Sequence, residues 1–233
     1  MKSLRYSLLI VASLLAVTSS IFVSACAEGT STKTVASQPG GKVMPTESNP
    51  IVIDPANREL RIAAKVNGAT FTTPTWHAVV YTSGQAAGDS VFQSYASPQF
   101  FYDAMKYFGG KPGNNMPMDN YSSTHVEGSG IDVSVTWDGA PKTYSLGEVL
   151  KDPDGANGKP INIKFGGNYD RIESGGTGCI TCLYSCPMGV SSNAAYDGDD
   201  FARQKAAGQA GFLANKAILP ADGTPVVITF KVQ

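Results

Sequence analysis

The chain has 233 residues, and its 18 lysines and arginines nearly balance its 19 aspartates and glutamates, giving a formal net charge of −1. It contains no basic run or stripe, so nucleic-acid binding has no electrostatic basis. The length is enough for one compact domain with a real core after the N-terminal segments are set aside.

The first residues have the features of a secretion signal. Lys2 and Arg5 precede a run of apolar and small residues from 7 to 23, and the sequence VSAC then ends at Cys26. A charged start and a short apolar core are typical of export signals and differ from a stop-transfer helix. The end of this run resembles the lipobox of bacterial lipoproteins, which implies a signal peptide over 1–25 and diacylglycerol on Cys26.

That resemblance also sets the expected location. Lipid on Cys26 would hold the protein outside the cytoplasm, on the cell membrane or the outer membrane. Ala27 follows the cysteine, so the aspartate that resembles an inner-membrane retention signal is absent, which favours the outer membrane in a double-membrane bacterium. The alternative is an ordinary secretory signal with a coincidental cysteine. We expect the membrane and an unidentified redox or envelope protein as partners, and no nucleic acid.

A polar segment separates the signal from the rest of the chain. Residues 27–49 are mainly Ser, Thr, Gly, Pro and Lys, and such a composition cannot bury enough surface to offset the entropy lost on ordering. We therefore predict the lipidated cysteine and a flexible tether over 26–49, and a single β-rich domain over 50–233.

The domain begins with a strand pattern. Residues 51–68 alternate apolar and polar side chains on both sides of a Pro-Ala-Asn turn, which predicts a hairpin. Residues 76–84 are apolar and β-branched and end at a glycine turn. They predict a further strand, with residues 90–95 as its partner.

The period of the apolar residues then becomes helical. Ser97 can cap a helix, and Pro98 suits the first helical position. Apolar side chains follow at helical spacing: Phe101, Ala104, Met105 and Phe108. Glycines and a proline come next, so we predict one firm helix over 98–108.

The C-terminal half returns to strands. Residues 131–137 alternate and end in an Asp-Gly turn, with 142–146 as the return strand. Residues 161–165 and 224–232 are further predicted strands, and the alanine-rich segment 199–217 predicts a second helix, weakened by its glycines. The fold class expected is α+β, with a predominantly antiparallel β-sheet of sandwich-like or barrel-like form.

Three of the four cysteines form a C-x2-C-x3-C-P pattern: Cys179, Cys182 and Cys186. The first two have the spacing of thiol-disulfide oxidoreductases, with Cys186 as a partner thiol, although no βαβ pattern surrounds them. A structural disulfide with one remaining thiol is a second interpretation. A zinc site with a histidine as fourth ligand is a third, because C-x2-C pairs suit tetrahedral zinc.

Six longer segments together resemble one family. In chain order they are WHAVVY, FYDAMKYFGGKPGNN, VTWDG, FGGN, GCITCLYSCPMGVSSNAAY and DGTPVVITF. This series resembles the YdjY-type, or ferredoxin-like, bacterial lipoproteins over about residues 50–233. The ferredoxin-like label rests on the cysteine segment, and it implies an iron-sulfur cluster that works in electron transfer.

The match to a bacterial ferredoxin run, C-x2-C-x2-C-x3-C-P, covers its last three cysteines and the proline, Pro187. Gly176 stands where the first cysteine of that run would be, so a single cluster would need a fourth ligand from elsewhere. The candidates for it are His77, His125, Asp170 and Glu173. Because the signal lacks an arginine pair, the chain should cross the membrane unfolded and acquire any cluster outside.

No motif of the familiar enzyme classes is present. The sequence lacks G-x-S-x-G, H-E-x-x-H, a Walker loop and G-x-G-x-x-G. We therefore expect a lipid-anchored protein that uses its cysteine loop in electron transfer or redox chemistry. The alternative is a non-enzymatic binding or envelope-assembly lipoprotein in which the cysteines form a disulfide or a zinc site.

Overall fold

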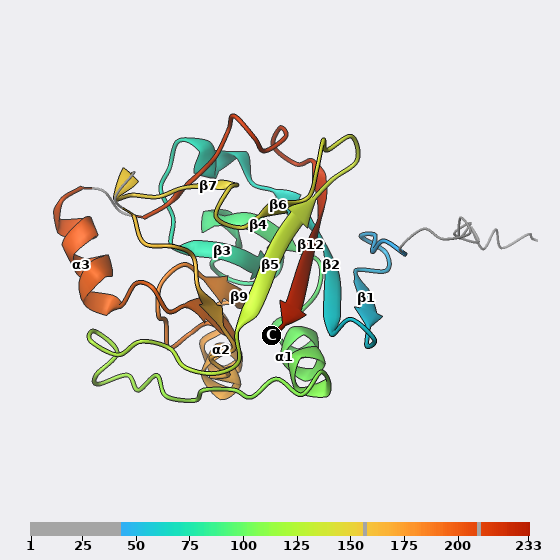
Figure 1. The fold of residues 1–233 in the computed structure, drawn as a ribbon. Helices are drawn as coiled ribbons and strands as arrows, with labels where there is room; N and C mark the ends of the chain where they lie inside the picture. The colour runs from blue at the N-terminus through green and yellow to red at the C-terminus, as the bar shows by residue number, and fades with distance from the viewer. Residues whose placement is uncertain (1–42, 156–157, 209–210) are drawn as a thin grey trace, which may run out of the picture. The chain divides into compact units, whose positions relative to one another are not determined.

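The computed structural model describes residues 43–155, 158–208 and 211–233 (Figure 1). Every described residue lies in a single compact unit. The predicted signal peptide, the lipidated Cys26 and the tether as far as residue 42 lie outside the described residues. Among the described residues, no helix is long and apolar enough to cross a membrane.

The described part of the chain consists mainly of strands, with helices between groups of them. The strands are β1 (Ile51–Asp54), β2 (Glu59–Val66), β3 (His77–Tyr81), β4 (Ser90–Ser94), β5 (Ile131–Thr136), β6 (Tyr144–Ser145), β7 (Leu150–Lys151), β8 (Ile163–Lys164), β9 (Cys179–Cys182), β10 (Ser191–Asn193), β11 (Leu213–Ala214) and β12 (Pro225–Val232). The helices are α1 (Pro98–Tyr107), α2 (Tyr169–Gly175) and α3 (Gly198–Ala206), with short 3-10 turns η1 (Gly68–Phe71) and η2 (Ala87–Asp89).

One large sheet organises this unit, with the strand order β6-β5-β12-β2-β4-β3-β9-β10-β8 and with β1 also paired to β2. The hairpin predicted over 51–68 is confirmed as the antiparallel pair β1 and β2. The strand predicted over 224–232 is confirmed as β12, which lies between β2 and β5 and is paired on both sides (Figure 1). The β-branched and apolar residues of β2 and β12 suit such a central position.

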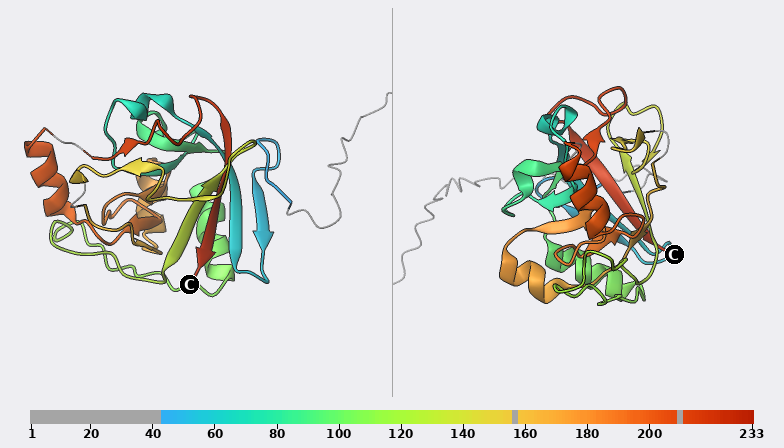
Figure 2. Two further views of the ribbon diagram at one scale, coloured as in Figure 1. Left: turned by 45° about the horizontal axis from the view of Figure 1, so that its top comes forward. Right: turned by 90° about the vertical axis from the view of Figure 1, so that its left-hand side faces the viewer.

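The sheet curls on itself into a half-barrel (Figure 2). An isolated bridge joins Gly130, just before β5, to Lys164 in β8, so strands far apart in the sheet order come together. The main core lies between this curved sheet and the apolar face of α1. Phe101 of α1 contacts Phe230 of β12 edge to face, with ring centroids 4.7 Å apart.

The sheet is mixed, which corrects in part the expectation of a predominantly antiparallel sheet. β3 runs parallel to β4, and β9 runs parallel to β10. Short connections, 82–89 and 183–190, join the two strands of each pair by crossing back along the sheet. Connections this short usually form hairpins, so residues 90–95 suggested an antiparallel partner.

The two predicted helices are present, but one is shorter than expected. α1 begins as predicted, with the Ser97 hydroxyl accepting a hydrogen bond from the Phe100 N–H. α3 begins with a capping box between Asp197 and Asp200 and ends at Ala206, before Gly208 with its φ of +71°. Residues 213–214 of the predicted helix form strand β11 instead. The sequence interpretation missed α2, a short helix between two left-handed residues, Asn168 and Gly176.

Candidate metal centre

Strands β3 and β9 bring the first three site residues together. The strands are antiparallel, with His77 opposite Cys182 and Val80 opposite Cys179. The register shifts twice within the pair, because Ala78 is an extra residue in β3 and Ile180 is an extra residue in β9. The bulge in β9 lets Ile180 face the main core while Cys179 and Cys182 lie in a separate cluster on the other side.

Cys186 joins this cluster from the connection between β9 and β10. It packs with Val80 and Ala87 against the other two cysteines, and Tyr184 and Met188 cover the group in part. All three cysteines are free thiols, with 1% exposure at Cys179, 0% at Cys182 and 4% at Cys186. The site therefore consists of buried sulfur that half-buried side chains partly cover.

The ligand atoms are close enough to hold one ion. His77 Nδ1 lies 3.2 Å from Cys179 Sγ. The ligand atoms of His77, Cys179 and Cys182 all lie within 4.8 Å of one another. Cys186 Sγ lies outside this group of three but is hydrogen-bonded to Cys182, and it accepts a hydrogen bond of 3.3 Å from the backbone N–H of Met188.

The three thiols differ in their pKa values. Hydrogen bonding to Cys182, helped by His77, lowers the pKa of Cys179 to about 5 despite burial. Hydrogen bonding to Cys182 likewise lowers the pKa of Cys186. Hydrogen bonds with these two sulfurs, together with burial, raise the pKa of Cys182 well above its ordinary range. Cys182 therefore keeps its proton between two sulfurs that lose theirs more readily.

The pKa of His77 is affected by the neighbouring thiols. Burial by itself would lower the pKa of His77, but the hydrogen bond and charge of Cys179, followed by the charge of Cys186, raise it. The pair of Cys179 and His77 thus resembles a thiolate beside an imidazolium. When an ion displaces the proton, the same two atoms become ligands.

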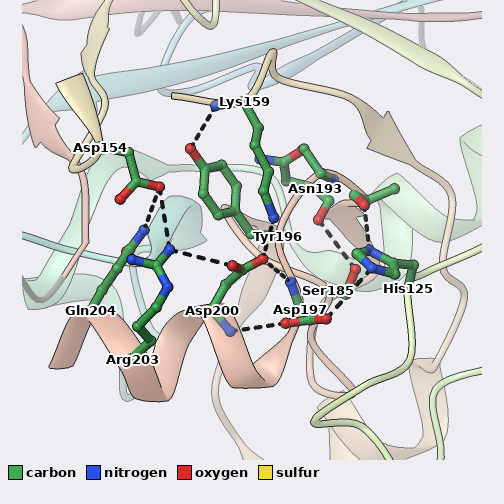
Figure 3. A network of polar contacts seen from close by, with 12 residues as sticks. His125, Asp154, Lys159, Ser185, Asn193, Tyr196, Asp197, Asp200, Arg203 and Gln204 are labelled. Carbon is green, nitrogen blue, oxygen red and sulfur yellow. Dashed lines mark hydrogen bonds and ion pairs between the residues drawn. The ribbon is translucent and has the colours of Figure 1, made fainter. Parts of the chain in front are cut away.

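His125, the other histidine considered as a ligand, lies elsewhere (Figure 3). Its Nδ1 is 2.7 Å from the carbonyl oxygen of Ala194, and its Nε2 is 3.5 Å from the carboxylate of Asp197. Figure 3 shows it at one end of a polar network in which Lys159 and Arg203 both contact Asp200. This network ties α3 to neighbouring loops.

The remaining ligand candidates also stay apart from the grouped atoms. Asp170 and Glu173 belong to α2 and are not members of the group that His77, Cys179 and Cys182 form. Gly176, at the position of the missing ferredoxin cysteine, caps α2 with a φ of +62°. A side chain built there would meet the Gln85 amide at 2.9 Å.

Two neighbours of the site were missed by the sequence interpretation. Burial, followed by the charges of Cys186 and Cys182, raises the pKa of Tyr184, so its phenol stays protonated and can donate to Cys186. Met188 packs against the thiols two residues after Cys186. The local signal for both was their position within the cysteine segment itself, since turns fold neighbouring side chains onto a cluster.

A family model described as the YdjY domain matches residues 51–231. The chain belongs to this family. The resemblance to YdjY-type proteins is thereby confirmed over nearly all of the described residues. A relative from Escherichia coli (strain K12), whose name is "Uncharacterized protein YdjY", is 42% identical over 187 residues, which cover 80% of each chain. No solved structure matches the chain significantly.

Proposed function

We propose that this YdjY-family chain is a lipid-anchored extracytoplasmic protein that binds one thiophilic metal ion through Cys179, Cys182, Cys186 and His77. The convergence of the ligand atoms of His77, Cys179 and Cys182 within 4.8 Å is the observation that carries the proposal. Buried thiols are seldom gathered with a histidine for packing alone, whereas these are the ligand types that zinc and monovalent copper prefer.

The donor set fits a single ion with little rearrangement. Bonds of about 2.3 Å to sulfur and about 2.0 Å to nitrogen, at tetrahedral angles, place ligand atoms about 3.4–3.8 Å apart. His77 Nδ1 and Cys179 Sγ are already 3.2 Å apart, and Cys182 Sγ lies within 4.8 Å of the ligand atoms of both residues. The ion would supply positive charge that replaces the protons now shared among the thiols.

An iron-sulfur cluster, the cofactor that the family resemblance implies, suits the site less well. A cluster distributes its thiolates over several irons, so the sulfurs must stand farther apart than around one ion. The space beside Cys182 is also filled, because even a methyl group added at Gly189 would lie 2.9 Å from Cys182 Sγ. Electron transfer through a cluster stays a prediction. Analysis of bound metal and acid-labile sulfide distinguishes it from the binding of a single ion.

A disulfide between Cys179 and Cys182 is the alternative use of this pair. Both are free thiols in the structure. Their sulfurs lie with His77 Nδ1 in one group of three ligand atoms within 4.8 Å of one another. Such a group of one nitrogen and two sulfurs suits a shared ion better than a bond between the two sulfurs alone.

Metal analysis of anaerobically purified mature protein tests the proposal. We expect about one equivalent of zinc or copper and no acid-labile sulfide. Co²⁺ added to metal-free protein should give sulfur-to-cobalt charge-transfer absorption and tetrahedral visible bands. Cys179→Ser and His77→Ala should weaken both, whereas His125→Ala is the matched control that should not. Stoichiometric iron with sulfide, or no bound metal at all, would contradict the proposal.

The lipid anchor is supported by the export signal and the lipobox-like residues before Cys26. Mass spectrometry of the mature N-terminus should find a diacylglycerol-modified Cys26, and the protein should partition into detergent. Cys26→Ser should release it into the aqueous fraction. An unmodified N-terminus produced by ordinary signal cleavage would contradict the anchor without affecting the metal site.

A further inference from the structure

Met188 places a thioether side chain against the three thiols. Its side chain packs on the cluster of Cys179, Cys182 and Cys186, and its backbone N–H donates to Cys186 Sγ. On its other side it lies against Gly175, where an added methyl group would meet Met188 Cε at 2.4 Å. The side chain is thus confined between the end of α2 and the sulfur cluster.

Met188 belongs to the half-buried cover of the cluster. Val80 and Ala87 are buried beside the thiols, while Ala86, Tyr184 and Met188 are only half-buried. The loop that carries Ala86 is held in place, since the Ala86 and Gln85 N–H groups donate to the carbonyls of Thr177 and Gly176. Among these half-buried side chains, Met188 is the one that carries a sulfur atom.

The chemistry of these atoms selects among metals. Thiolate and thioether sulfur together favour monovalent copper, a soft ion, whereas zinc takes thiolate, imidazole and carboxylate ligands and gains little from a thioether. The atoms that converge most closely are one nitrogen and two sulfurs, from His77, Cys179 and Cys182. Monovalent copper can be held by these three donors with the thioether beside them, whereas tetrahedral zinc would use Cys186 as its fourth ligand.

We propose that the ion taken by this site is Cu⁺ and that Met188 is a further ligand residue that selects it over Zn²⁺. This inference rests on the proposed function. Binding involves no change of oxidation state. Cu⁺ forms bonds to thiolate sulfur and to the thioether, and each thiol that becomes a ligand releases its proton to solvent.

Competition with a chromogenic Cu⁺ chelator under anaerobic conditions tests the inference in the full mature chain, with Zn²⁺ affinity measured in parallel. Met188→Leu removes the thioether at similar size and should weaken Cu⁺ binding by roughly tenfold while leaving Zn²⁺ affinity within about twofold. Met118→Leu is the matched control, since Met118 is 57% exposed and outside the cluster, and it should change neither. Near-ultraviolet circular dichroism confirms that both variants remain folded.

The outcomes separate this inference from the proposed function. A site that binds Zn²⁺ but competes poorly for Cu⁺, or a Met188→Leu variant with unchanged Cu⁺ affinity, would overturn the inference and leave the metal site intact. If wild-type protein and Cys179→Ser both fail to bind either ion, the proposed function has failed and the inference fails with it.

Discussion

Cys182 occupies the middle of the sulfur cluster and shares hydrogen bonds with the cysteines on both sides. Its fully buried position makes a charge there costly, so the negative charge falls on Cys179 and Cys186. The arrangement gives the metal-free site one ready thiolate beside His77 and a proton that an entering ion must displace.

A pH titration of the metal-free protein tests this charge distribution. Since the pKa of Cys179 is lowered to about 5, thiolate absorbance in the ultraviolet should first rise near that pH. The lowered pKa of Cys179 also makes the stability of the folded state depend on pH. A lowered pKa stabilises the folded state fully above the ordinary thiol pKa of about 8.5 and loses that contribution as pH falls towards 5.

Variants identify the group that titrates. Cys179→Ser should abolish the early rise in absorbance, and His77→Gln should move it to higher pH because the neighbouring hydrogen bond and positive charge are lost. An early rise that persists in Cys179→Ser would assign the thiolate to another cysteine.

Gly189 tests how tightly the cluster is packed. A methyl group at this position would stand 2.9 Å from Cys182 Sγ and 2.8 Å from the carbonyl oxygen of Ser191. Gly189→Ala should therefore lower the free energy of unfolding by about 1–3 kcal/mol, the usual cost of overpacking, and should weaken metal binding. Gly88→Ala is the control, because a methyl group there meets nothing within 4 Å. Denaturant unfolding of both variants measures the difference.

At the scale of elements, two crossover connections surround the site. Residues 82–89 follow β3 and residues 183–190 follow β9, and they supply Ala86 and Ala87 from one side and Cys186 and Met188 from the other. Because each connection returns the chain parallel to its starting strand, both pass over the same region of the sheet. The cluster is therefore built mostly from connections, with the sheet providing Cys179, Cys182 and His77.

The start of α3 allows a test of helix capping beside this region. The Asp197 carboxylate accepts a hydrogen bond of 2.9 Å from the Asp200 N–H. Asp197→Ala should lower the free energy of unfolding by about 1 kcal/mol, the typical value of an N-cap. Asp199→Ala removes an acidic side chain from the same turn but keeps the cap, so a thermal melt should show a much smaller loss. Equal losses in the two variants would contradict a capping role for Asp197.

Local patterns predicted the elements better than their pairing. Ser97 and Pro98 identified the start of α1, and alternation identified β5, since these signals lie within a few residues. The direction of β4 beside β3 depended on how loop 82–89 crosses the sheet, which no local pattern records. α2 was missed because its seven residues are too few for a helical period to show.

At the site, too, local sequence identified the residues better than their grouping in space. Cysteine spacing singled out all three thiols, and His77 was among the candidate fourth ligands. Only the pairing of β3 with β9 shows that His77, and not His125, lies beside the cysteines. The residues of these two strands are about a hundred positions apart in the chain. The role of Met188 depended on burial, which spacing alone does not give.

For the whole molecule, the core and the metal site are separate. The main cluster of buried apolar residues joins the curled sheet to α1 and α2, while the cysteines form a second, smaller cluster with Val80 and Ala87. A domain of this length buries enough apolar surface to fold without metal, unlike zinc fingers, which unfold when the ion is removed.

Metal removal should therefore leave the protein folded. We expect chelator-treated protein to keep its near-ultraviolet circular dichroism and to unfold cooperatively. Adding the ion at about a hundred times its Kd should stabilise the fold by about 2.7 kcal/mol through mass action. Cys179→Ser should lose most of this increase. Complete unfolding after chelation would show that the site is structural.

The extra residue Ile180 in β9 changes the number of residues between the two cysteines of that strand. Along an unbroken strand, two side chains on one face are separated by a single residue, so paired sulfurs would appear as C-x-C. The bulge adds one position and changes that spacing to C-x2-C while both sulfurs still face the same side. A spacing usually associated with helix starts or zinc loops thus arises here from a strand, and deleting Ile180 would turn one of the two sulfurs into the main core.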